Sequence, residues 1–144
     1  MTTMRKILDG KGYTFWFVSP YDPVRLALQR LAEHQAGALL VMDGERLLGL
    51  FSERDFVRRV AQSGALDLET PVKDVMTARV LGVNLETSLD ACLSLMTHRR
   101  FRHVPVLKDG MVVGVVSIGD VVKAQLEDKE AALKAYEGVV ANPA

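Results

Sequence analysis

The stretch GLFSERD at residues 49–55 returns as GVVSIGD at residues 114–120, and this pair of stretches decides the fold. Around it, residues 18–60 align with residues 83–125 at a shift of 65 positions. The alignment needs one insertion and one deletion, both at the Asp-Gly turns, which lie at residues 43–44 and 109–110. A repeat of this length inside one chain indicates two copies of one supersecondary unit that pack together.

Each copy of the repeat predicts the same order of elements: a strand, a helix, a hairpin of two strands and a second helix. Apolar residues at helical spacing mark the first helix. An Asp-Gly pair between two continuous apolar runs marks the hairpin, whose strands we expect to be buried on both faces. A serine three residues before an aspartate marks the second helix. The expected strands lie at 15–19, 38–42 and 47–51 in the first copy, and at 80–84, 104–107 and 111–116 in the second.

Capping residues predict where the helices begin. Asp22 comes before Pro23, which is the pattern of an N-cap followed by proline at the first helical position. In the second copy, Thr87 and Asp90 form a start that resembles a capping box. Alternating charges near the C-terminus favour a solvated helical tail. The second helices are expected to end near Ser63-Gly64 in the first copy, and to continue through residues 127–136 in the second.

The predicted fold class is α/β (α+β), with two repeats that are each arranged β-α-β-β-α. Because one copy cannot cover its own sheet, we expect the two copies to pack about a pseudo-two-fold axis. The expected division of the chain is 1–65 for the first repeat with the N-terminal segment, 66–77 for a linker, and 78–144 for the second repeat with its C-terminal helical tail.

The composition narrows the class of partner. The chain has 144 residues, 18 of them basic and 18 acidic, so charge gives no reason to expect nucleic acid or an anionic membrane. Cys92 is the single cysteine, which excludes an internal disulfide and fits a reducing compartment. Residues 1–12 lack the apolar core of a signal peptide, and no apolar run approaches the roughly 20 residues that span a bilayer. We therefore expect a soluble, cytoplasmic protein.

Sequence motifs for catalysis and for metal binding are missing from the chain. It contains no phosphate-binding loop, no nucleophile elbow and no zinc-protease motif. His34, His98 and His103 do not have the spacing of metal ligands. Asp55 and Asp120 lack a neighbour that would make either one a general acid or base. The sequence therefore predicts a protein that is not an enzyme and holds no metal.

The repeated pattern resembles the tandem CBS family, named for cystathionine β-synthase, whose paired repeats are called a Bateman module. The likeness covers nearly the whole chain and indicates a stand-alone member. It implies homodimers, and two clefts between the repeats that accept AMP, ATP, NAD or S-adenosylmethionine. Many members regulate a partner. The residues that carry the likeness are 36–41 and 49–55 in the first copy, 72–77 between the copies, and 102–106 and 114–120 in the second.

The resemblance implies a nucleotide site built from matched positions. The aspartate of each Ser-x-x-Asp would accept hydrogen bonds from ribose hydroxyls, while the serine and the helix start face a phosphate. Basic residues would reach the phosphate, a Gly-Ala pair would approach the base, and the segments before each repeat would form the adenine wall. The expected nucleotide-binding residues are Ser52, Arg54, Asp55, Ser117, Ile118, Asp120, Arg102, His103, Val104, Pro105, Gly37, Ala38, Thr14, Phe15, Thr77 and Val80.

Several of these positions also have a purely structural interpretation. Ser-x-x-Asp is the pattern of an ordinary capping box. Gly37 fits a glycine at a helix C-terminus, and Phe15 fits strand packing. Pro105 removes a strand donor and would leave a local opening in the ladder of the second copy.

The two clefts are expected to differ, because Gly119 stands in the second copy where the first has Arg54. Arg102 and His103 match the family pattern better than their counterparts in the first copy. We therefore expect Asp120 to matter more for nucleotide binding than its first-copy counterpart.

Together these observations predict a regulatory module for signal transduction that binds an adenine nucleotide between its repeats and acts on an unknown partner protein. AMP is the first candidate, and ATP, ADP or NAD are the others. The alternative is a dimeric interaction scaffold that works without a ligand. A melting shift on adding nucleotide discriminates between the two.

Overall fold

We analysed a computed structural model, which describes the backbone of residues 1–140 and the side chains of residues 1–134. Within these residues the chain forms five α-helices, one short 3-10 helix and two three-stranded sheets. The elements are α1 (Met4–Lys11), β1 (Phe17–Val18), α2 (Val24–His34), β2 (Ala38–Asp43), β3 (Arg46–Ser52), α3 (Glu53–Ser63), η1 (Val72–Asp74), β4 (Val83–Asn84), α4 (Leu89–Arg99), β5 (His103–Lys108), β6 (Met111–Ser117) and α5 (Ile118–Val140).

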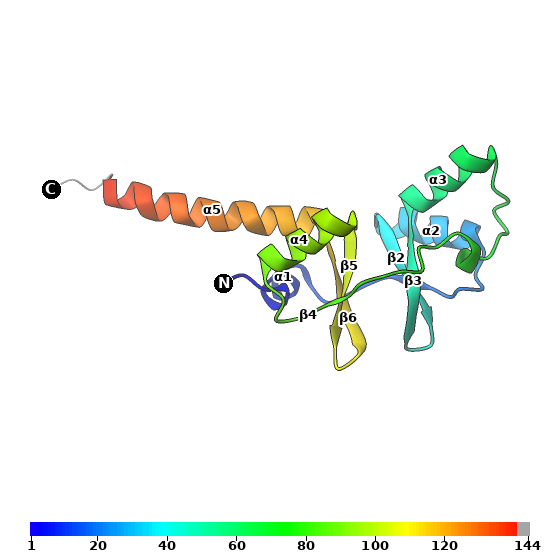
Figure 1. The fold of residues 1–144 in the computed structure, drawn as a ribbon, viewed down its shortest axis with the longest axis horizontal. Helices are drawn as coiled ribbons and strands as arrows, with labels where there is room; N and C mark the ends of the chain where they lie inside the picture. The colour runs from blue at the N-terminus through cyan, green and yellow to red at the C-terminus, as the bar shows by residue number, and fades with distance from the viewer. Residues whose placement is uncertain (141–144) are drawn as a thin grey trace.

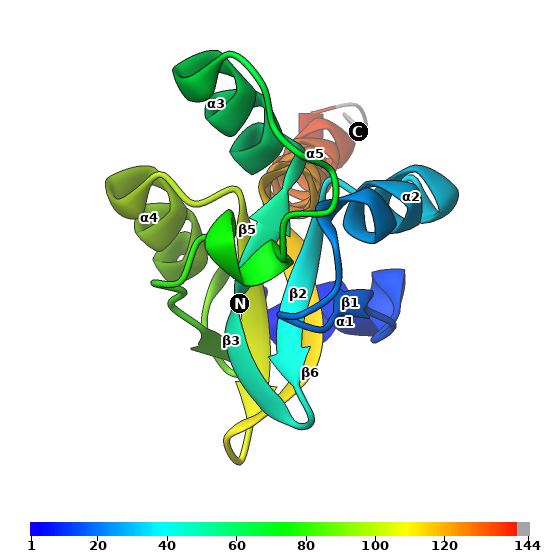
Figure 2. The same cartoon turned by 90° about the vertical axis from the view of Figure 1, so that its right-hand side faces the viewer.

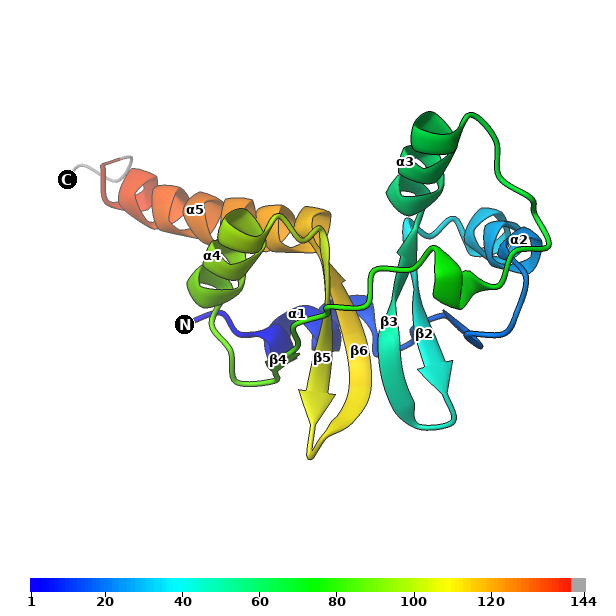
Figure 3. The same ribbon diagram turned by 45° about the vertical axis from the view of Figure 1, so that its right-hand side comes forward.

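The two sheets have the same topology, in the orders β1-β2-β3 and β4-β5-β6. In each, the short first strand pairs in parallel with the second, and the second and third form an antiparallel hairpin. Helices α2 to α5 lie toward one end of the sheets and the hairpin turns point to the other (Figures 1 and 3). Viewed from the side, one sheet lies behind the other (Figure 2). This arrangement confirms the predicted β-α-β-β-α repeat.

Each repeat has its own hydrophobic core, and the first helix of each repeat supplies equivalent residues to it. Helix α2 buries Val24, Ala27 and Leu31, and α4 buries the residues 65 positions later, Leu89, Cys92 and Met96. Burial raises the pKa of the Cys92 thiol to about 11, so the thiol stays protonated and serves as a small apolar group.

Two predicted helix starts are wrong by one residue, for a shared reason. The N-cap of α2 is Pro23 rather than Asp22, and that of α4 is Ser88 rather than the pair of Thr87 and Asp90. The side chains of Asp22 and Thr87 instead accept a hydrogen bond from the backbone amide three residues earlier. Position 22 and its counterpart 87 therefore stabilise the turn that leads into the helix.

Helix α1 was not predicted, and it packs on the second repeat although it comes before the first. Met4 and Leu8 are fully buried in the core of the second repeat. A Cβ atom at Gly114 of β6 would lie 2.9 Å from Leu8 Cδ1, which shows how closely the helix approaches this strand. The predicted division assigns the N-terminal segment to the first repeat, but α1 packs in the core of the second repeat.

The segment that precedes each repeat completes the other repeat. Residues 70–73 bind the start of α2. Residues 2–5, which lie 68 positions before residues 70–73, bind the start of α4 in the same way. Much of the predicted linker is thus part of the first repeat. The matching backbone hydrogen bonds run from Val72 N to Asp22 O and from Met4 N to Thr87 O, and from Val24 N to Thr70 O and from Leu89 N to Thr2 O.

Candidate functional site

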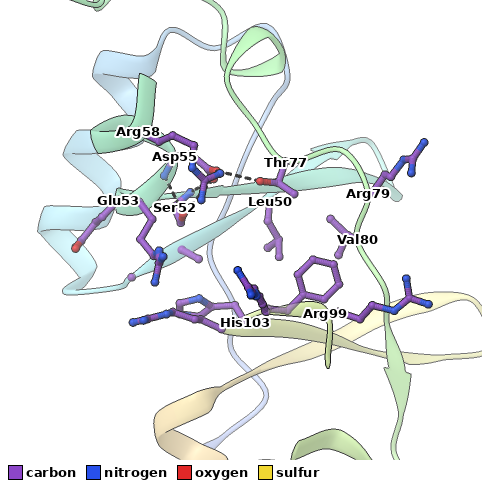
Figure 4. Close-up of a pocket in the computed structure, with 16 residues that line it drawn as sticks. Leu50, Ser52, Glu53, Asp55, Arg58, Thr77, Arg79, Val80, Arg99 and His103 are labelled. Atoms are coloured by element: carbon purple, nitrogen blue, oxygen red, sulfur yellow. Dashed lines mark hydrogen bonds and ion pairs between the residues drawn. The ribbon is translucent and has the colours of Figure 1, made fainter. Parts of the chain in front are cut away.

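A cavity of about 520 Å³ lies between the two repeats (Figure 4). The first repeat contributes the starts of β2 and α3 and the end of β3. The connecting segment adds residues 77–80, and the second repeat adds the end of α4 and the start of β5. The lining residues are Gly37, Ala38, Leu50, Ser52, Glu53, Arg54, Asp55, Arg58, Thr77, Arg79, Val80, Arg99, Arg100, Phe101, Arg102 and His103.

Asp55 lies in this cavity at the first turn of α3, with its side chain 8% exposed. Its Oδ2 accepts hydrogen bonds from the amide (2.9 Å) and hydroxyl (3.0 Å) of Ser52, whose Oγ accepts from the Asp55 amide, so the predicted capping box is present. Thr77 Oγ1 donates to Oδ1 at 2.9 Å. A carboxylate has about four acceptor sites, so one remains for a ligand hydroxyl. Asp55 is therefore a cap that keeps an acceptor available.

Two backbone amides in the first turn of α3 already have acceptors. The amide of Glu53 donates to the carbonyl of Gly37, and the amide of Asp55 donates to Ser52 Oγ. These N–H groups are satisfied within the protein, so the start of α3 has fewer free donors for a phosphate than predicted. Positive charge for an anion must come mainly from side chains.

The second repeat forms the opposite wall through Arg102 and His103. A Cβ atom at Gly37 would lie 3.2 Å from His103 Nε2, so glycine allows the two repeats to approach at this point. The alternative interpretation of Gly37 as a helix C-cap is wrong, because Gln35 closes α2 in the left-handed conformation.

The surroundings of His103 favour the neutral form of its imidazole. Burial lowers the pKa of His103, and the positive charge of Lys11 lowers it further. Glu53 and Asp120 act in the opposite direction, and Arg102 adds to the lowering. A phosphate in the cavity would replace part of the lost solvation and favour the protonated ring.

Asp120 has different surroundings from its counterpart Asp55. Lys11 Nζ donates to Asp120 Oδ2 at 2.6 Å and to the carbonyl of Val115 at 3.0 Å. In the first repeat, Thr77 makes the equivalent pair of contacts, with its hydroxyl and its backbone amide. Burial acts to raise the pKa of Asp120, but the hydrogen bonds from Lys11 and from the Ser117 amide outweigh it, and the pKa is lowered.

Asp120 lies at the edge of a second cavity of about 510 Å³. This cavity is formed by α1 and the first turns of α5, and it contains none of the residues of the first cavity. The expectation that Arg102 and His103 serve Asp120 therefore needs correction. The structure places both residues in the cavity of Asp55, because the cavity wall is formed across the repeats.

Nine of the sixteen predicted site residues line the first cavity: Gly37, Ala38, Ser52, Arg54, Asp55, Thr77, Val80, Arg102 and His103. The other seven lie elsewhere. Val104 is fully buried in the core of the second repeat, and Pro105 is a buried residue of β5 paired with Val115. Ser117 caps α5, next to Ile118, whose amide binds the carbonyl of Arg102. The remaining three are Asp120, the exposed Thr14 and the half-buried Phe15.

Sequence reasoning missed the seven other lining residues. The strongest available signal is the run RRFRH at residues 99–103, of which only Arg102 and His103 are predicted site residues. Arg79 lies next to the predicted Val80, and Arg58 is one helical turn beyond Arg54. The residues missed are Leu50, Glu53, Arg58, Arg79, Arg99, Arg100 and Phe101.

The part of the chain that the structure describes has neither a cluster of metal ligands nor a membrane-spanning helix. There, no three histidine, cysteine, aspartate or glutamate side chains come together as a metal site. No helix in the same part combines the length and the apolar character needed to cross a membrane.

Two β-α-β-β-α repeats with a polar cavity between them define a tandem-repeat module with a ligand-sized site. The family sequence model of the CBS domain matches residues 14–62 and 72–127, so this chain belongs to the CBS domain family. It is 34% identical over 137 residues to the mitochondrial CBS domain-containing protein CBSX3 of Arabidopsis thaliana, covering 88% of this chain and 66% of the relative. The protein YhcV of Bacillus subtilis is 30% identical over 114 residues, covering 79% and 81%.

Solved structures of tandem CBS proteins share the fold. The crystal structure of the CBS-domain protein ATU1752 from Agrobacterium tumefaciens has a TM-score of 0.82 and 40% identity, covering 86% of this chain and 99% of that one. A crystal structure of CBSX2 in complex with AMP has a TM-score of 0.72 and 28% identity, covering 90% and 99%. The chain therefore has the architecture of a Bateman module.

Proposed function

We propose that this protein is a regulatory module that binds an adenine nucleotide in the cavity between its repeats and transmits the bound state to a partner protein. The observation that carries the proposal is the cavity itself, which combines an acceptor at Asp55 with a basic wall formed by Arg102 and His103. The AMP complex of the related protein CBSX2 supports an adenine nucleotide as the ligand class.

The lining of the cavity suits the three parts of a nucleotide. Leu50, Val80 and Phe101 offer apolar surface for a base. Asp55 offers its remaining acceptor site to a ribose hydroxyl, and a second hydroxyl would compete with Thr77 for Oδ1. The arginines supply charge-assisted donors for phosphate oxygens. In this arrangement the ligand touches both repeats, so binding changes how firmly they are held together.

AMP, ADP, ATP and NAD are the candidate ligands. We propose a regulatory role without catalysis, in the cytoplasm and as a homodimer. The non-catalytic role is supported by the residues of the cavity, which act as helix caps, offer apolar surface or carry positive charge. Support for the homodimer comes from apolar side chains that stay exposed on α3 and α5.

Mass spectrometry of small molecules released from the purified protein, followed by calorimetric titration with AMP, ADP, ATP and NAD, tests the proposal. A ligand that binds only the folded protein stabilises it by about 2.7 kcal/mol at a hundredfold excess over Kd. We expect a rise in Tm with at least one of the four nucleotides, and a smaller rise in the Asp55→Ala variant.

The alternative function is a dimeric scaffold that binds no ligand. It predicts no change in Tm and no heat of binding with any of the four nucleotides at millimolar concentration. That result would reject the proposed function.

A further inference from the structure

The cavity between the repeats is far more basic than the molecule that contains it. Six arginines line it, against the two carboxylates of Glu53 and Asp55. The whole chain has as many acidic as basic residues, so this concentration is a local property of the cavity. Glu53 points away from the centre of the cavity in Figure 4. The six are Arg54, Arg58, Arg79, Arg99, Arg100 and Arg102.

Most of these guanidinium groups are not neutralised within the protein. Arg58 lies 3.9 Å from Asp55 Oδ1, and the other five form no ion pair with any carboxylate in the part of the chain that the structure describes. By contrast, Arg25 outside the cavity pairs with Glu69. Arginine keeps its charge at all relevant pH values and presents a planar set of donors that fits phosphate oxygens.

The arginines are also spread along the cavity. Arg58 lies beside Asp55, whereas the side chains of Arg79 and Arg99 start at the opposite side of the lining and point outward past Val80 (Figure 4). A single terminal phosphate carries a charge of about −1.5 to −2 and has three acceptor oxygens. Three acceptor oxygens are too few for six guanidinium groups, each of which presents five N–H donors. A chain of linked phosphoryl groups offers more acceptor oxygens, and it balances more of the positive charge.

We propose that the cavity selects nucleotides in which two or more phosphoryl groups are linked, such as ADP, ATP or a dinucleotide, over nucleoside monophosphates. The inference rests on the proposed function and specifies its ligand. Arg79 and Arg99 act as specificity residues for the second and later phosphoryl groups. Two of the first-turn amides of α3 are already satisfied, so the selection depends on these side chains rather than on the helix start.

The test is calorimetric titration of the full chain with AMP, ADP, ATP and NAD, in EDTA and at two salt concentrations. We expect ADP to bind about tenfold more tightly than AMP, since one charge-assisted hydrogen bond has that effect. We expect the affinity for ADP to fall more steeply with added salt, because more charges are brought together. The arms with ATP and NAD tell a free triphosphate from a pyrophosphate bridged between two nucleosides.

The double variant Arg79→Gln/Arg99→Gln should bring the ratio of ADP to AMP affinity close to one. The matched control Arg25→Gln/Arg46→Gln removes the same charge at exposed positions outside the cavity lining, and should keep the wild-type ratio. Equal affinities of the wild type for AMP and ADP would overturn this inference and leave the proposed function standing. An equal change of this ratio in both double variants would also overturn the inference and leave the proposed function standing. Binding of no nucleotide at all would overturn both.

Discussion

Asp55 and Asp120 occupy the same position in the two repeats but differ in what surrounds them. Asp55 lines the cavity between the repeats and receives the neutral hydroxyl of Thr77, whereas Asp120 receives the ammonium group of Lys11. The hydrogen-bond donors to Asp55 are neutral, and its one cationic neighbour, Arg58, lies 3.9 Å away, so more of its negative charge stays available to a ligand. The charge of Asp120 is already matched within the protein. The repeat symmetry of the sequence therefore does not extend to the chemistry of these two carboxylates.

The variants Asp55→Ala and Asp120→Ala test this difference. Asp55→Ala should weaken nucleotide binding at least tenfold, because a hydrogen bond to a charged acceptor contributes about 1.5–3 kcal/mol. Asp120→Ala should leave the affinity near that of the parent. Both should lose about 1 kcal/mol of stability, because each residue belongs to a capping box. Titration and melting of the same samples separate the two effects, and a weaker ligand affinity in Asp120→Ala alone would contradict the assignment.

The lowered pKa of His103 predicts a pH dependence of stability. Its pKa is lowered in the folded protein, so the unfolded chain binds a proton more readily. The free energy of unfolding should therefore fall as the pH drops below about 6.5, the ordinary pKa of histidine. In His103→Gln this dependence should be weaker. Urea unfolding between pH 5 and pH 8 gives the comparison (roughly the range in which histidine titrates).

Ligand binding should reverse this effect of His103. A phosphate in the cavity raises the pKa of the ring, so binding takes up protons, and affinity rises as the pH is lowered toward 6. Calorimetry in buffers with different heats of ionisation measures the protons taken up. The phosphate itself also titrates near pH 6, so the quantity to compare is the difference between the parent and His103→Gln. An identical proton uptake in the two proteins would exclude contact between His103 and the phosphate.

Among the elements, β3 and β6 show how each repeat depends on a segment from outside it. A Cβ atom at Gly49 of β3 would lie 2.5 Å from the backbone oxygen of Thr77, and one at Gly114 of β6 would lie 2.9 Å from the end of the Leu8 side chain. The contact at Gly49 is with backbone, which cannot move without breaking the hydrogen bonds between Thr77 and Leu50. The contact at Gly114 is with a side chain that can rotate.

Gly49→Ala should therefore destabilise the protein more than Gly114→Ala. Overpacking typically costs about 1–3 kcal/mol, and we expect Gly49→Ala at the upper end of this range. Because a loss of 1 kcal/mol lowers Tm by about 2–4 °C in a protein of this size, thermal melting resolves the two variants. Gly49→Ala should also weaken nucleotide binding, since Thr77 lines the cavity. Equal losses of stability would show that the connecting segment moves as easily as a side chain.

Helix α1 should be essential to the second repeat. Leu8→Ala removes a fully buried side chain and should cost about 2–5 kcal/mol, measured by urea unfolding. Lys6→Ala also truncates a side chain of the same helix to alanine, but at an exposed position, and should have little effect. If Leu8→Ala were as stable as Lys6→Ala, α1 would contribute nothing to the core.

The sequence predicted local elements better than it predicted contacts between distant segments. The hairpins around Gly44 and Gly110 were placed within a residue or two, since an Asp-Gly turn and the apolar runs beside it are local signals. Helix α1 was missed because it is short and its apolar partners lie more than 80 residues away along the chain. Arg102 and His103 were assigned to the wrong aspartate because membership of a repeat does not reveal which residues face each other across the cavity.

At the scale of the whole molecule, apolar side chains at matched positions of α3 and α5 are exposed. Val57 is 63% exposed and Val122, its counterpart 65 residues later, is 41% exposed, with Leu126 and Leu133 further along α5. Helix α5 extends well beyond the sheets (Figure 1). An apolar surface of this kind is typical of a site of self-association.

We expect a homodimer in solution, and we expect Val57→Glu/Val122→Glu to shift it toward monomer. A charge placed in an apolar interface would be buried without a partner. The control Met111→Glu introduces the same charge at an exposed apolar residue of the β5–β6 hairpin and should leave the dimer intact. Light scattering measures the mass of each protein, and a monomeric parent at tens of micromolar would contradict the expectation.

The packing of α1 against β6 also fixes an order of events during synthesis. The first repeat can close once residue 77 has left the ribosome, because residues 70–77 complete it. Helix α1 must wait for Gly114 and the rest of β6, which at 5–20 residues per second takes roughly 5–20 seconds. A helix of eight residues is not stable by itself, so α1 remains unfolded during that time. Helix α1, although translated well before β6, is therefore among the last of these elements to dock, and for that interval Met4 and Leu8 are open to chaperones and proteases.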